Sequence, residues 1–116
     1  MIRGEVYDAR FDPVEGSEQG GIRPAVIVSR DQLNAALSTV VVLPCSTYRP
    51  GRRIHAAQML LRAPEGGLRY DSVVLGEQVR ALAKHRLFRR RGSVSRQAMA
   101  GIEAVLAVAL DLPEQM

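Results

Sequence analysis

Residues 39–46 read Thr-Val-Val-Val-Leu-Pro-Cys-Ser, a run that begins with four β-branched residues and stays apolar as far as the cysteine. A short, continuously apolar run of this kind is typical of a strand that is buried on both faces. Residues 24–29, Pro-Ala-Val-Ile-Val-Ser, have the same character, and residues 30–38 between the two runs have room for a helical turn. The fold is therefore expected to form around two buried strands.

Toward the N-terminus, residues 5–11 alternate between apolar and polar side chains, which predicts a half-buried strand. The next segment, residues 13–22, contains three glycines, two glutamates and no periodicity, so it is expected to form a long loop. Loops of this length in compact domains are usually functional. In the alternating strand, Tyr7, Ala9 and Phe11 fall on the predicted buried face, and Asp8 and Arg10 fall on the predicted solvent face.

Two more strands are expected further along the chain, at residues 55–61 and 71–82. The glycine pair at residues 66–67 marks a turn between them. Gly76 lies inside the second strand, where a glycine indicates a bulge or a close approach of another backbone segment.

A terminal helix is predicted after Ser95, whose side chain can cap it, with Val94 and Met99 placed as a hydrophobic staple. About five short strands followed by one helix predict a mainly β (α+β) fold, either a strongly curved antiparallel sheet or a partly open barrel. The apolar residues that share one helical face are Met99, Ile102, Val105, Leu106, Ala109 and Leu110.

Length and composition limit the class of protein. With 116 residues, 47% of them hydrophobic, the chain is expected to form one compact domain over residues 1–116. The apolar runs are too short for a membrane span and the N-terminus lacks a signal sequence, so a cytoplasmic protein is expected. A single cysteine and two histidines provide neither a disulfide nor a metal cluster, and no cofactor is predicted.

The basic charge is carried almost wholly by arginine. The formal net charge is +4, and Lys84 is the only lysine. Arginine donates in pairs to phosphate oxygens, which favours a polyanionic partner such as nucleic acid. The alternative is a general compositional bias toward arginine.

Two places in the chain suggest chemistry. Arg23 follows a glycine pair and enters an apolar strand, where its guanidinium would be held more firmly than on a free loop. Ser46 and Thr47 end the most apolar strand and could donate a hydrogen bond to a phosphoryl oxygen. The alternatives are a solvated turn arginine and hydroxyls that satisfy turn backbone. Cys45 is expected to be a core residue.

Basic clusters and aromatic side chains could bind a nucleic acid without reading its sequence. Each cluster could equally be a solvated face. The first cluster is Arg49, Arg52 and Arg53, the second is Arg86, Arg89, Arg90 and Arg91, and the aromatic candidates for stacking on bases are Tyr48, Tyr70 and Phe88.

Five segments, in order along the chain, resemble the MazF/PemK family of toxin endoribonucleases. They are Arg-Gly-Glu-Val-Tyr at residues 3–7, Asp-Pro at 12–13, Gly-Ser-Glu-Gln-Gly-Gly-Ile-Arg-Pro at 16–24, Val-Leu-Pro-Cys-Ser at 42–46, and Asp-Ser-Val-Val-Leu-Gly-Glu-Gln-Val-Arg at 71–80. The resemblance implies an SH3-like barrel of about five to seven strands with a C-terminal helix. It also implies a homodimeric, metal-independent toxin that cleaves single-stranded RNA such as mRNA at a short sequence and is neutralised by a cognate antitoxin with an acidic, partly disordered segment.

The resemblance also implies roles for individual residues. The family's catalytic arginine falls on Arg23 and its catalytic threonine on Ser46, a departure that keeps the hydroxyl but loses the methyl group. Thr47 supplies the hydroxyl instead if the alignment is shifted by one residue. Glu18 is the nearby candidate base, and Ile22 stands where some members carry histidine. The residues expected to bind RNA are Gln19, Thr47, Tyr48, Arg49, Arg52, Arg53, Glu77, Gln78 and Arg80.

The expected reaction uses the nucleophile that RNA itself carries. Attack by the 2′-hydroxyl would give 2′,3′-cyclic phosphate and 5′-hydroxyl ends, with Arg23 stabilising the charge on the phosphorane. The general acid stays unassigned, because a guanidinium is a poor proton donor. Two alternatives are a noncatalytic toxin of the same fold that binds DNA gyrase through its terminal helix, and a small barrel that binds RNA without cleaving it.

Overall fold

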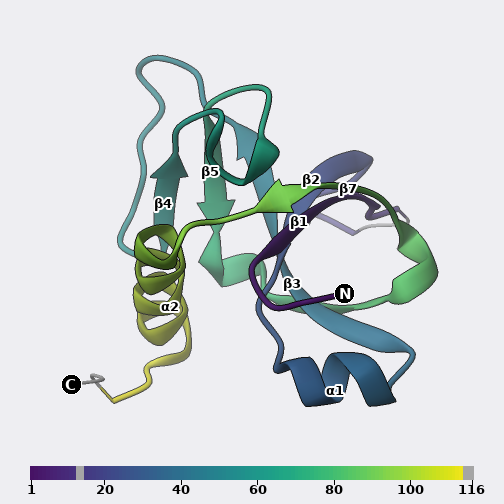
Figure 1. The fold of residues 1–116 in the computed structure, drawn as a ribbon. Coiled ribbons are helices and arrows are strands. Elements are labelled where there is room, and N and C mark those ends of the chain that lie inside the picture. Colours follow the sequence, from purple (N-terminus) through teal and green to yellow (C-terminus); the bar gives the residue numbers. More distant parts are fainter. Residues whose placement is uncertain (13–14, 114–116) are drawn as a thin grey trace.

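The structure, a computed structural model, describes residues 1–12 and 15–113. Within these residues the chain forms seven strands, two α-helices and three short 3-10 helices (Figure 1). In chain order they are β1 (Glu5–Arg10), β2 (Ile22–Ile27), α1 (Asp31–Ala36), β3 (Thr39–Thr47), β4 (Gln58–Leu61), η1 (Glu65–Gly67), β5 (Ser72–Leu75), η2 (Gly76–Gln78), β6 (Arg80–Ala83), η3 (Lys84–Arg86), β7 (Leu87–Ser93) and α2 (Arg96–Leu110).

β3 is the central strand of one antiparallel sheet. The order across the sheet is β4-β5-β3-β2-β1-β7, and β6 also pairs with β3. β4 and β5 lie to one side of β3, and β2, β1 and β7 lie to the other (Figure 1). The mainly β fold with a C-terminal helix is thus confirmed.

The strand expected at residues 71–82 is present as two strands on either side of η2. β5 pairs with the end of β3, with Cys45 opposite Val74, and β6 pairs with its beginning, with Val42 opposite Arg80. A Cβ atom on Gly76 would lie 2.4 Å from the carbonyl oxygen of Ala57, closer than real Cβ contacts. The close backbone approach expected at Gly76 is therefore confirmed. Gly76 itself begins the 3-10 helix η2, which separates the two strands.

Hydrophobic cores form on both faces of β3, as its unbroken apolar run predicts. Leu43 and Cys45 contribute to one cluster, and Val40 and Val42 contribute to the other. The first cluster also contains Val6, Val26, Leu61, Leu68, Val74 and Ile102, and the second contains Ala9, Phe11, Ala25, Ile27, Leu82 and Leu87.

The terminal helix α2 begins as predicted. The Ser95 hydroxyl oxygen accepts a hydrogen bond from the backbone N–H of Ala98 at 3.1 Å, and Ile102 and Val105 are buried. The helix stands beside β4 in Figure 1. Leu110, predicted on the buried face, is half exposed, so the apolar stripe of α2 extends beyond the surface that the sheet covers. No helix in the part of the chain that the structure describes is long and apolar enough to cross a membrane.

One expectation about charged residues is wrong. Arg89 and Arg91 lie in β7, which pairs with β1, and Arg89 is exposed there. Asp8, expected on the solvent face of β1, is only 6% exposed, and its carboxylate accepts a hydrogen bond from Arg91 Nε at 2.8 Å. The ion pair from the neighbouring strand allows this carboxylate to be buried.

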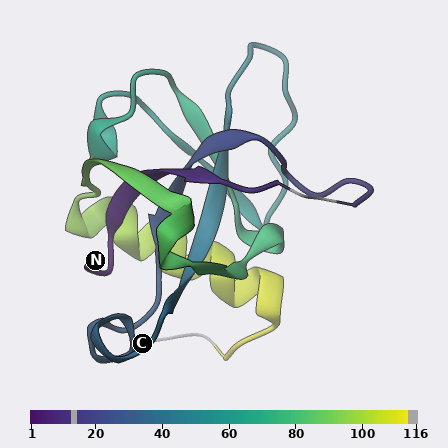
Figure 2. The same ribbon diagram turned by 90° about the vertical axis from the view of Figure 1, so that its right-hand side faces the viewer.

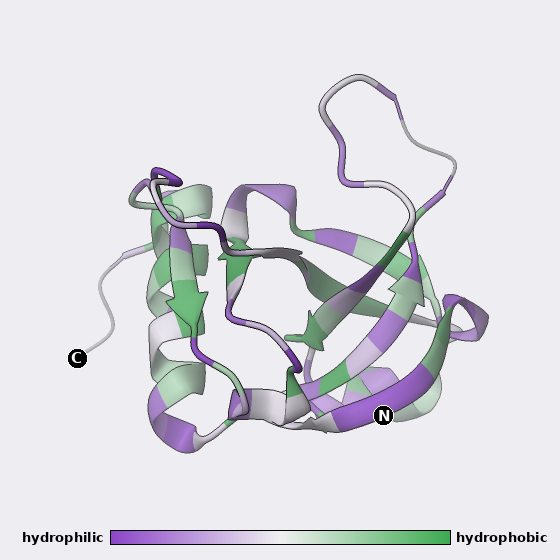
Figure 3. Cartoon of the chain, turned by 90° about the horizontal axis from the view of Figure 1, so that it is seen from above, coloured by the Kyte–Doolittle hydropathy of each residue, from purple (hydrophilic) through white to green (hydrophobic). Residues whose placement is uncertain are grey.

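One strand also begins later than predicted. The strand expected at 55–61 is shorter, because β4 begins at Gln58, and residues 55–57 form the approach to it. Residues 15–21 of the predicted loop extend away from the body of the molecule (Figure 3), and residues 13–14 lie outside the described residues. The predicted helical turn is confirmed as α1.

Candidate active site

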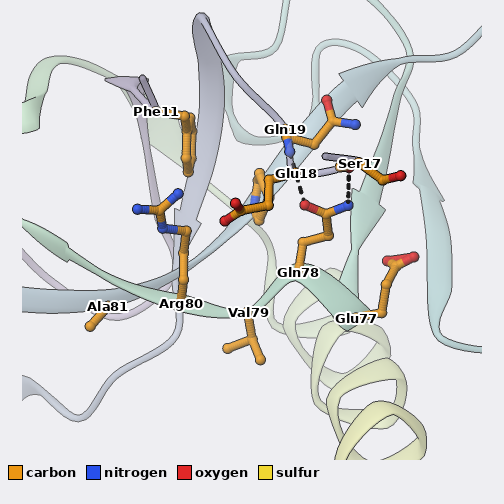
Figure 4. A pocket seen from close by; sticks show the side chains of 10 residues that line it. Phe11, Ser17, Glu18, Gln19, Glu77, Gln78, Val79, Arg80 and Ala81 are labelled. Carbon is orange, nitrogen blue, oxygen red and sulfur yellow. Dashed lines mark hydrogen bonds between the residues drawn. The ribbon is translucent and has the colours of Figure 1, made fainter. Parts of the chain in front are cut away.

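A pocket of about 610 Å³ opens between the β1–β2 loop and the η2–β6 segment. Figure 4 shows side chains from both segments directed toward this space. The two segments are far apart in the sequence. They are brought together because the loop leads into β2 and η2 leads into β6, and both of these strands pair with β3. The lining residues are Phe11, Ser17, Glu18, Gln19, Pro44, Glu77, Gln78, Val79, Arg80 and Ala81.

Arg23 lies at the start of β2, at the end of the sheet where β3 finishes. The pairing of β2 with β3 runs from Ile27 opposite Val42 to Ala25 opposite Pro44. Arg23 comes two residues before this last pair, at the start of β2, and Ser46 comes two residues after it, near the end of β3. The half-buried Arg23 donates from Nε to the carbonyl oxygen of Gly20 at 2.8 Å. This bond fixes the plane of the guanidinium and uses neither of its two terminal nitrogens.

The Ser46 hydroxyl is buried and already engaged. Its oxygen accepts a hydrogen bond from Arg52 Nη1 at 2.6 Å, and the same nitrogen lies 3.4 Å from the carbonyl oxygen of Thr47. A hydroxyl that accepts from a guanidinium keeps its own proton for another acceptor, such as a phosphoryl oxygen. The sequence placed Arg52 among the RNA-binding residues but did not predict its bond to Ser46.

Thr47 is exposed and lies next to a different pocket. A second pocket of about 190 Å³ is lined by Thr47, Arg23, Arg69 and Tyr70, among others. Arg23 therefore shares this pocket with Thr47, and Ser46 is not among the residues that line it. Tyr70, one of the aromatic side chains expected to stack on bases, is 62% exposed there.

Glu18 and Arg80 bring opposite charges to the first pocket. Figure 4 shows the Glu18 carboxylate directed into the pocket on the side of Arg80. The Arg80 guanidinium lies 5.7 Å from the centroid of the Phe11 ring, a cation–π contact that holds it at the pocket wall. The pocket thus combines a carboxylate that can accept a proton with a cation that can bind a phosphate.

Gln78 and Gln19 are also brought together, because the Gln78 side chain bonds to backbone atoms of the loop that contains Gln19. The backbone N–H of Gln19 donates to Gln78 Oε1 at 3.0 Å, and Gln78 Nε2 donates to the carbonyl oxygen of Ser17 at 3.2 Å (Figure 4). Both polar atoms of the Gln78 side chain therefore contact the protein. The Gln19 side chain is directed away from Gln78.

Glu77 takes part in a network that the sequence did not predict. Its Oε2 accepts from Gln58 Nε2 at 2.7 Å and lies 3.0 Å from His55 Nε2. The backbone N–H of Ala57 donates to His55 Nδ1 at 3.3 Å, so in the neutral ring Nε2 carries the proton and donates to Glu77. His55 and Glu77 are 22 residues apart in sequence, and no local pattern links them.

The other predicted RNA-binding residues differ in exposure to solvent. Arg49 and Arg53 are exposed on the β3–β4 loop, which projects at the top of Figure 2. Tyr48 is half-buried, and its backbone N–H donates to the carbonyl oxygen of Asp71 at 2.8 Å. Of the three loop arginines, Arg52 is thus the one that turns inward.

The single cysteine takes no part in this chemistry. Burial raises the pKa of the Cys45 thiol to about 12, so the thiol stays protonated at neutral pH. The expectation that Cys45 is a core residue is confirmed. Within residues 1–12 and 15–113, no three histidine, cysteine or acidic side chains gather as metal ligands would.

These features define a small mainly β protein with a seven-stranded antiparallel sheet and a C-terminal helix, in which Arg23 and Thr47 line one pocket at the end of the central strand. The family of PemK-like, MazF-like toxins of type II toxin–antitoxin systems matches residues 2–110, and the chain belongs to this family.

Individual relatives cover nearly the whole chain. It is 36% identical to endoribonuclease MazF9 of Mycobacterium tuberculosis, over 97% of this chain and 98% of that protein. It is 38% identical to endoribonuclease MazF of Staphylococcus saprophyticus, over 97% of this chain and 92% of that protein.

Solved structures agree with the fold. A mycobacterial endoribonuclease in complex with its cognate antitoxin has a TM-score of 0.80 at 26% identity, covering 99% of both chains. MazF from Deinococcus radiodurans also has a TM-score of 0.80, at 24% identity and covering 96% of both chains. The second likeness bears on the fold alone.

Proposed function

We propose that this chain is an endoribonuclease toxin that cleaves single-stranded RNA at a short sequence, without a metal ion. The observation that carries the proposal is the pocket that Arg23 and Thr47 line at the end of β3, next along the chain from the buried Ser46 hydroxyl that Arg52 contacts. The names of the two relatives that are 36% and 38% identical, both endoribonucleases, support the same activity.

The proposed reaction is a transfer within the RNA. The 2′-oxygen forms a bond to the adjacent phosphorus as its proton leaves, and the bond from phosphorus to the 5′-oxygen breaks as that oxygen gains a proton. The products are a 2′,3′-cyclic phosphate and a 5′-hydroxyl. The protein must orient the three atoms in line and stabilise the negative charge on the phosphorane.

Three side chains divide this work in the proposal. Arg23 grips the phosphoryl oxygens with its two free terminal nitrogens, since Nε is already bonded to Gly20. Ser46 donates its hydroxyl proton to the same phosphate. Glu18 takes the proton of the 2′-hydroxyl, and the general acid stays unassigned.

RNA on either side of the cut would lie along the two pockets and the loops beside them. Arg80 would supply positive charge to the first pocket, and Tyr70 would offer an exposed ring in the second. The other residues proposed to contact RNA are Gln19, Thr47, Tyr48, Arg49, Arg52, Arg53 and Glu77. Gln78, which the sequence placed among them, is left out because both polar atoms of its side chain bond to the β1–β2 loop.

We include an antitoxin and a second copy of the chain as partners. One structural relative was solved in complex with its cognate antitoxin, and the net charge of +4 here suits an acidic antitoxin segment lying across the RNA-binding surface. The noncatalytic gyrase-binding alternative is not favoured, because the named relatives are endoribonucleases.

The test is incubation of the purified protein with a long single-stranded RNA in EDTA, followed by sequencing of fragment ends. The parent should produce discrete cuts with cyclic phosphate ends, and Arg23→Ala should remove them. Ser46→Ala and Thr47→Ala, measured side by side, identify the hydroxyl that is needed. Intact RNA from a protein that still arrests growth when expressed would contradict the proposal and favour gyrase as the target.

A further inference from the structure

Gln78 projects from a turn that cannot shift easily. η2 is wedged at Gly76, whose backbone N–H donates to the Ala57 carbonyl oxygen at 2.9 Å. A Cβ atom there would lie 2.4 Å from that oxygen and 3.2 Å from the carbonyl oxygen of Val105 in α2. Strand pairing to β3 on both sides of the turn fixes its ends. Gln78 therefore projects from a rigid support.

The loop that Gln78 contacts has its other attachments at its base. Gly21 is bonded there to Asp12 Oδ1 at 3.0 Å and to the N–H of Phe11 at 2.9 Å. Further out, Glu18 bonds only within the loop, to the backbone of Glu15. Among the described residues, the two hydrogen bonds of Gln78 are those that join residues 15–19 to the body of the protein.

We propose that Gln78 is a positioning residue that holds Glu18 over the pocket, and that it does not read the RNA itself. We call the two hydrogen bonds from the Gln78 side chain to the backbone of Ser17 and Gln19 the Gln78 clamp. These two residues flank Glu18, so the clamp fixes the backbone on both sides of the carboxylate that Figure 4 shows directed into the pocket. The role of Glu18 in this inference rests on the proposed function.

The clamp requires an amide side chain of this length. One atom must accept from the Gln19 N–H, and another must donate to the Ser17 carbonyl oxygen. Methionine matches glutamine in length but does neither, so Gln78→Met removes the clamp while leaving a side chain of similar shape. Gln97→Ala, at an exposed position in the first turn of α2, is the matched control.

The first experiment measures the loop without RNA. A glutamate-specific protease is added to the folded protein, and cleavage after Glu15 and Glu18 is followed by mass spectrometry. Gln78→Met should raise this rate about tenfold, because the loop leaves the body more often once two hydrogen bonds are lost. Gln97→Ala should match the parent. An unchanged rate in Gln78→Met would overturn the clamp, whether or not the protein cleaves RNA.

The second experiment separates positioning from direct contact. In the parent background, Gln78→Met should lower kcat about tenfold, with little change in KM and with the same cut sites. In a Glu18→Ala background it should cause no further loss, because the residue it positions is gone. Effects that multiply in the double variant, or cut sites that move, would show that Gln78 contacts RNA and overturn the proposal. A parent without ribonuclease activity would instead contradict the proposed function, while the protease result still tests the clamp.

Discussion

The hydrogen bond from Arg52 to Ser46 gives the serine a firmer setting than its side chain alone would have. Serine lacks the methyl group that restricts the threonine rotamer, so its hydroxyl would otherwise sample more directions. Arg52 Nη1, 2.6 Å from Ser46 Oγ, supplies a fixed donor from the β3–β4 loop. The guanidinium thus orients the hydroxyl and adds positive charge where phosphate is proposed to bind.

Arg52→Ala should therefore lower RNA cleavage more than Arg53→Ala. The two arginines are adjacent in the same loop, but Arg53 is exposed, so the pair controls for loss of general phosphate attraction. We expect about a tenfold fall in kcat for Arg52→Ala and a smaller, salt-sensitive rise in KM for Arg53→Ala. Initial rates at two salt concentrations measure both. Equal kcat values in the two variants would contradict an orienting role for Arg52.

The lowered pKa of the Glu5 carboxyl group makes the stability of the fold depend on pH in the acid range. Burial alone would raise its pKa, but the hydrogen bond and charge of Arg90 and the N–H of Ile2 outweigh burial, so the net pKa lies below the ordinary value of 4.5. A carboxyl group with a lowered pKa in the folded state stabilises the protein above its unfolded pKa. That contribution is lost as the pH falls through the folded value.

The parent should therefore lose more stability on acidification than Glu5→Gln does. The difference in unfolding free energy between the two proteins should be constant at neutral pH and should shrink below a pH of about 4.5. Urea unfolding at several pH values measures it. A difference that stays constant down to pH 3 would show that Glu5 has the same pKa in the folded and unfolded states.

Among the elements, β7 contains three consecutive arginines, which obscure the alternating pattern by which a strand is predicted from sequence. Arg89 and Arg91 lie two residues apart on this strand, yet Arg91 is partly buried against Asp8 and Arg89 is exposed. Removing one partner of a buried ion pair leaves an uncompensated charge, which costs about 3 kcal/mol. Arg91→Ala should destabilise the fold by about that amount, and Arg89→Ala should stay within about 0.5 kcal/mol of the parent. Chemical denaturation distinguishes the two.

Elements specified by a local pattern could be predicted, and those specified by distant partners could not. The apolar run of β3, the cap at Ser95 and the glycine at residue 76 each act within a few residues, and the structure contains all three features. β7 was missed because its partner strand is far away in sequence, with Asp8 and Arg91 83 positions apart.

The site divides in the same way. The loop up to Arg23 and the end of β3 could be identified as candidate positions, because glycines, a hydroxyl and an arginine stand at predicted strand ends. The contacts of Gln78 with the loop join residues 59 and 61 positions apart. Such contacts depend on how the strands pair, and they leave no periodic signal in the sequence. For this reason the sequence did not show that Gln19 and Gln78, both expected to contact RNA, are hydrogen-bonded to each other.

For the whole molecule, we propose the outer face of α2 as the surface that meets a second copy of the chain. Val108, Leu110 and Leu112 are each about half exposed. Val108 and Leu112 line a groove of about 860 Å³ together with Ala104 and Ala107, whose small side chains allow another helix to approach. Glu103 and Asp111 also line the groove. In the proposed homodimer, its apolar side chains would be removed from water by their counterparts on the second copy.

Val108→Asp should convert the dimer to a monomer. A carboxylate in the middle of an apolar interface would be buried without a partner, and the two-fold symmetry would place a second one on the partner copy. Leu33→Asp on α1 is the matched control, because Leu33 is also 50% exposed but lies on another helix. Sedimentation equilibrium should give twice the monomer mass for the parent and Leu33→Asp, and the monomer mass for Val108→Asp. If Leu33→Asp dissociates and Val108→Asp does not, the copies meet through α1 instead, and a monomeric parent would exclude the homodimer altogether.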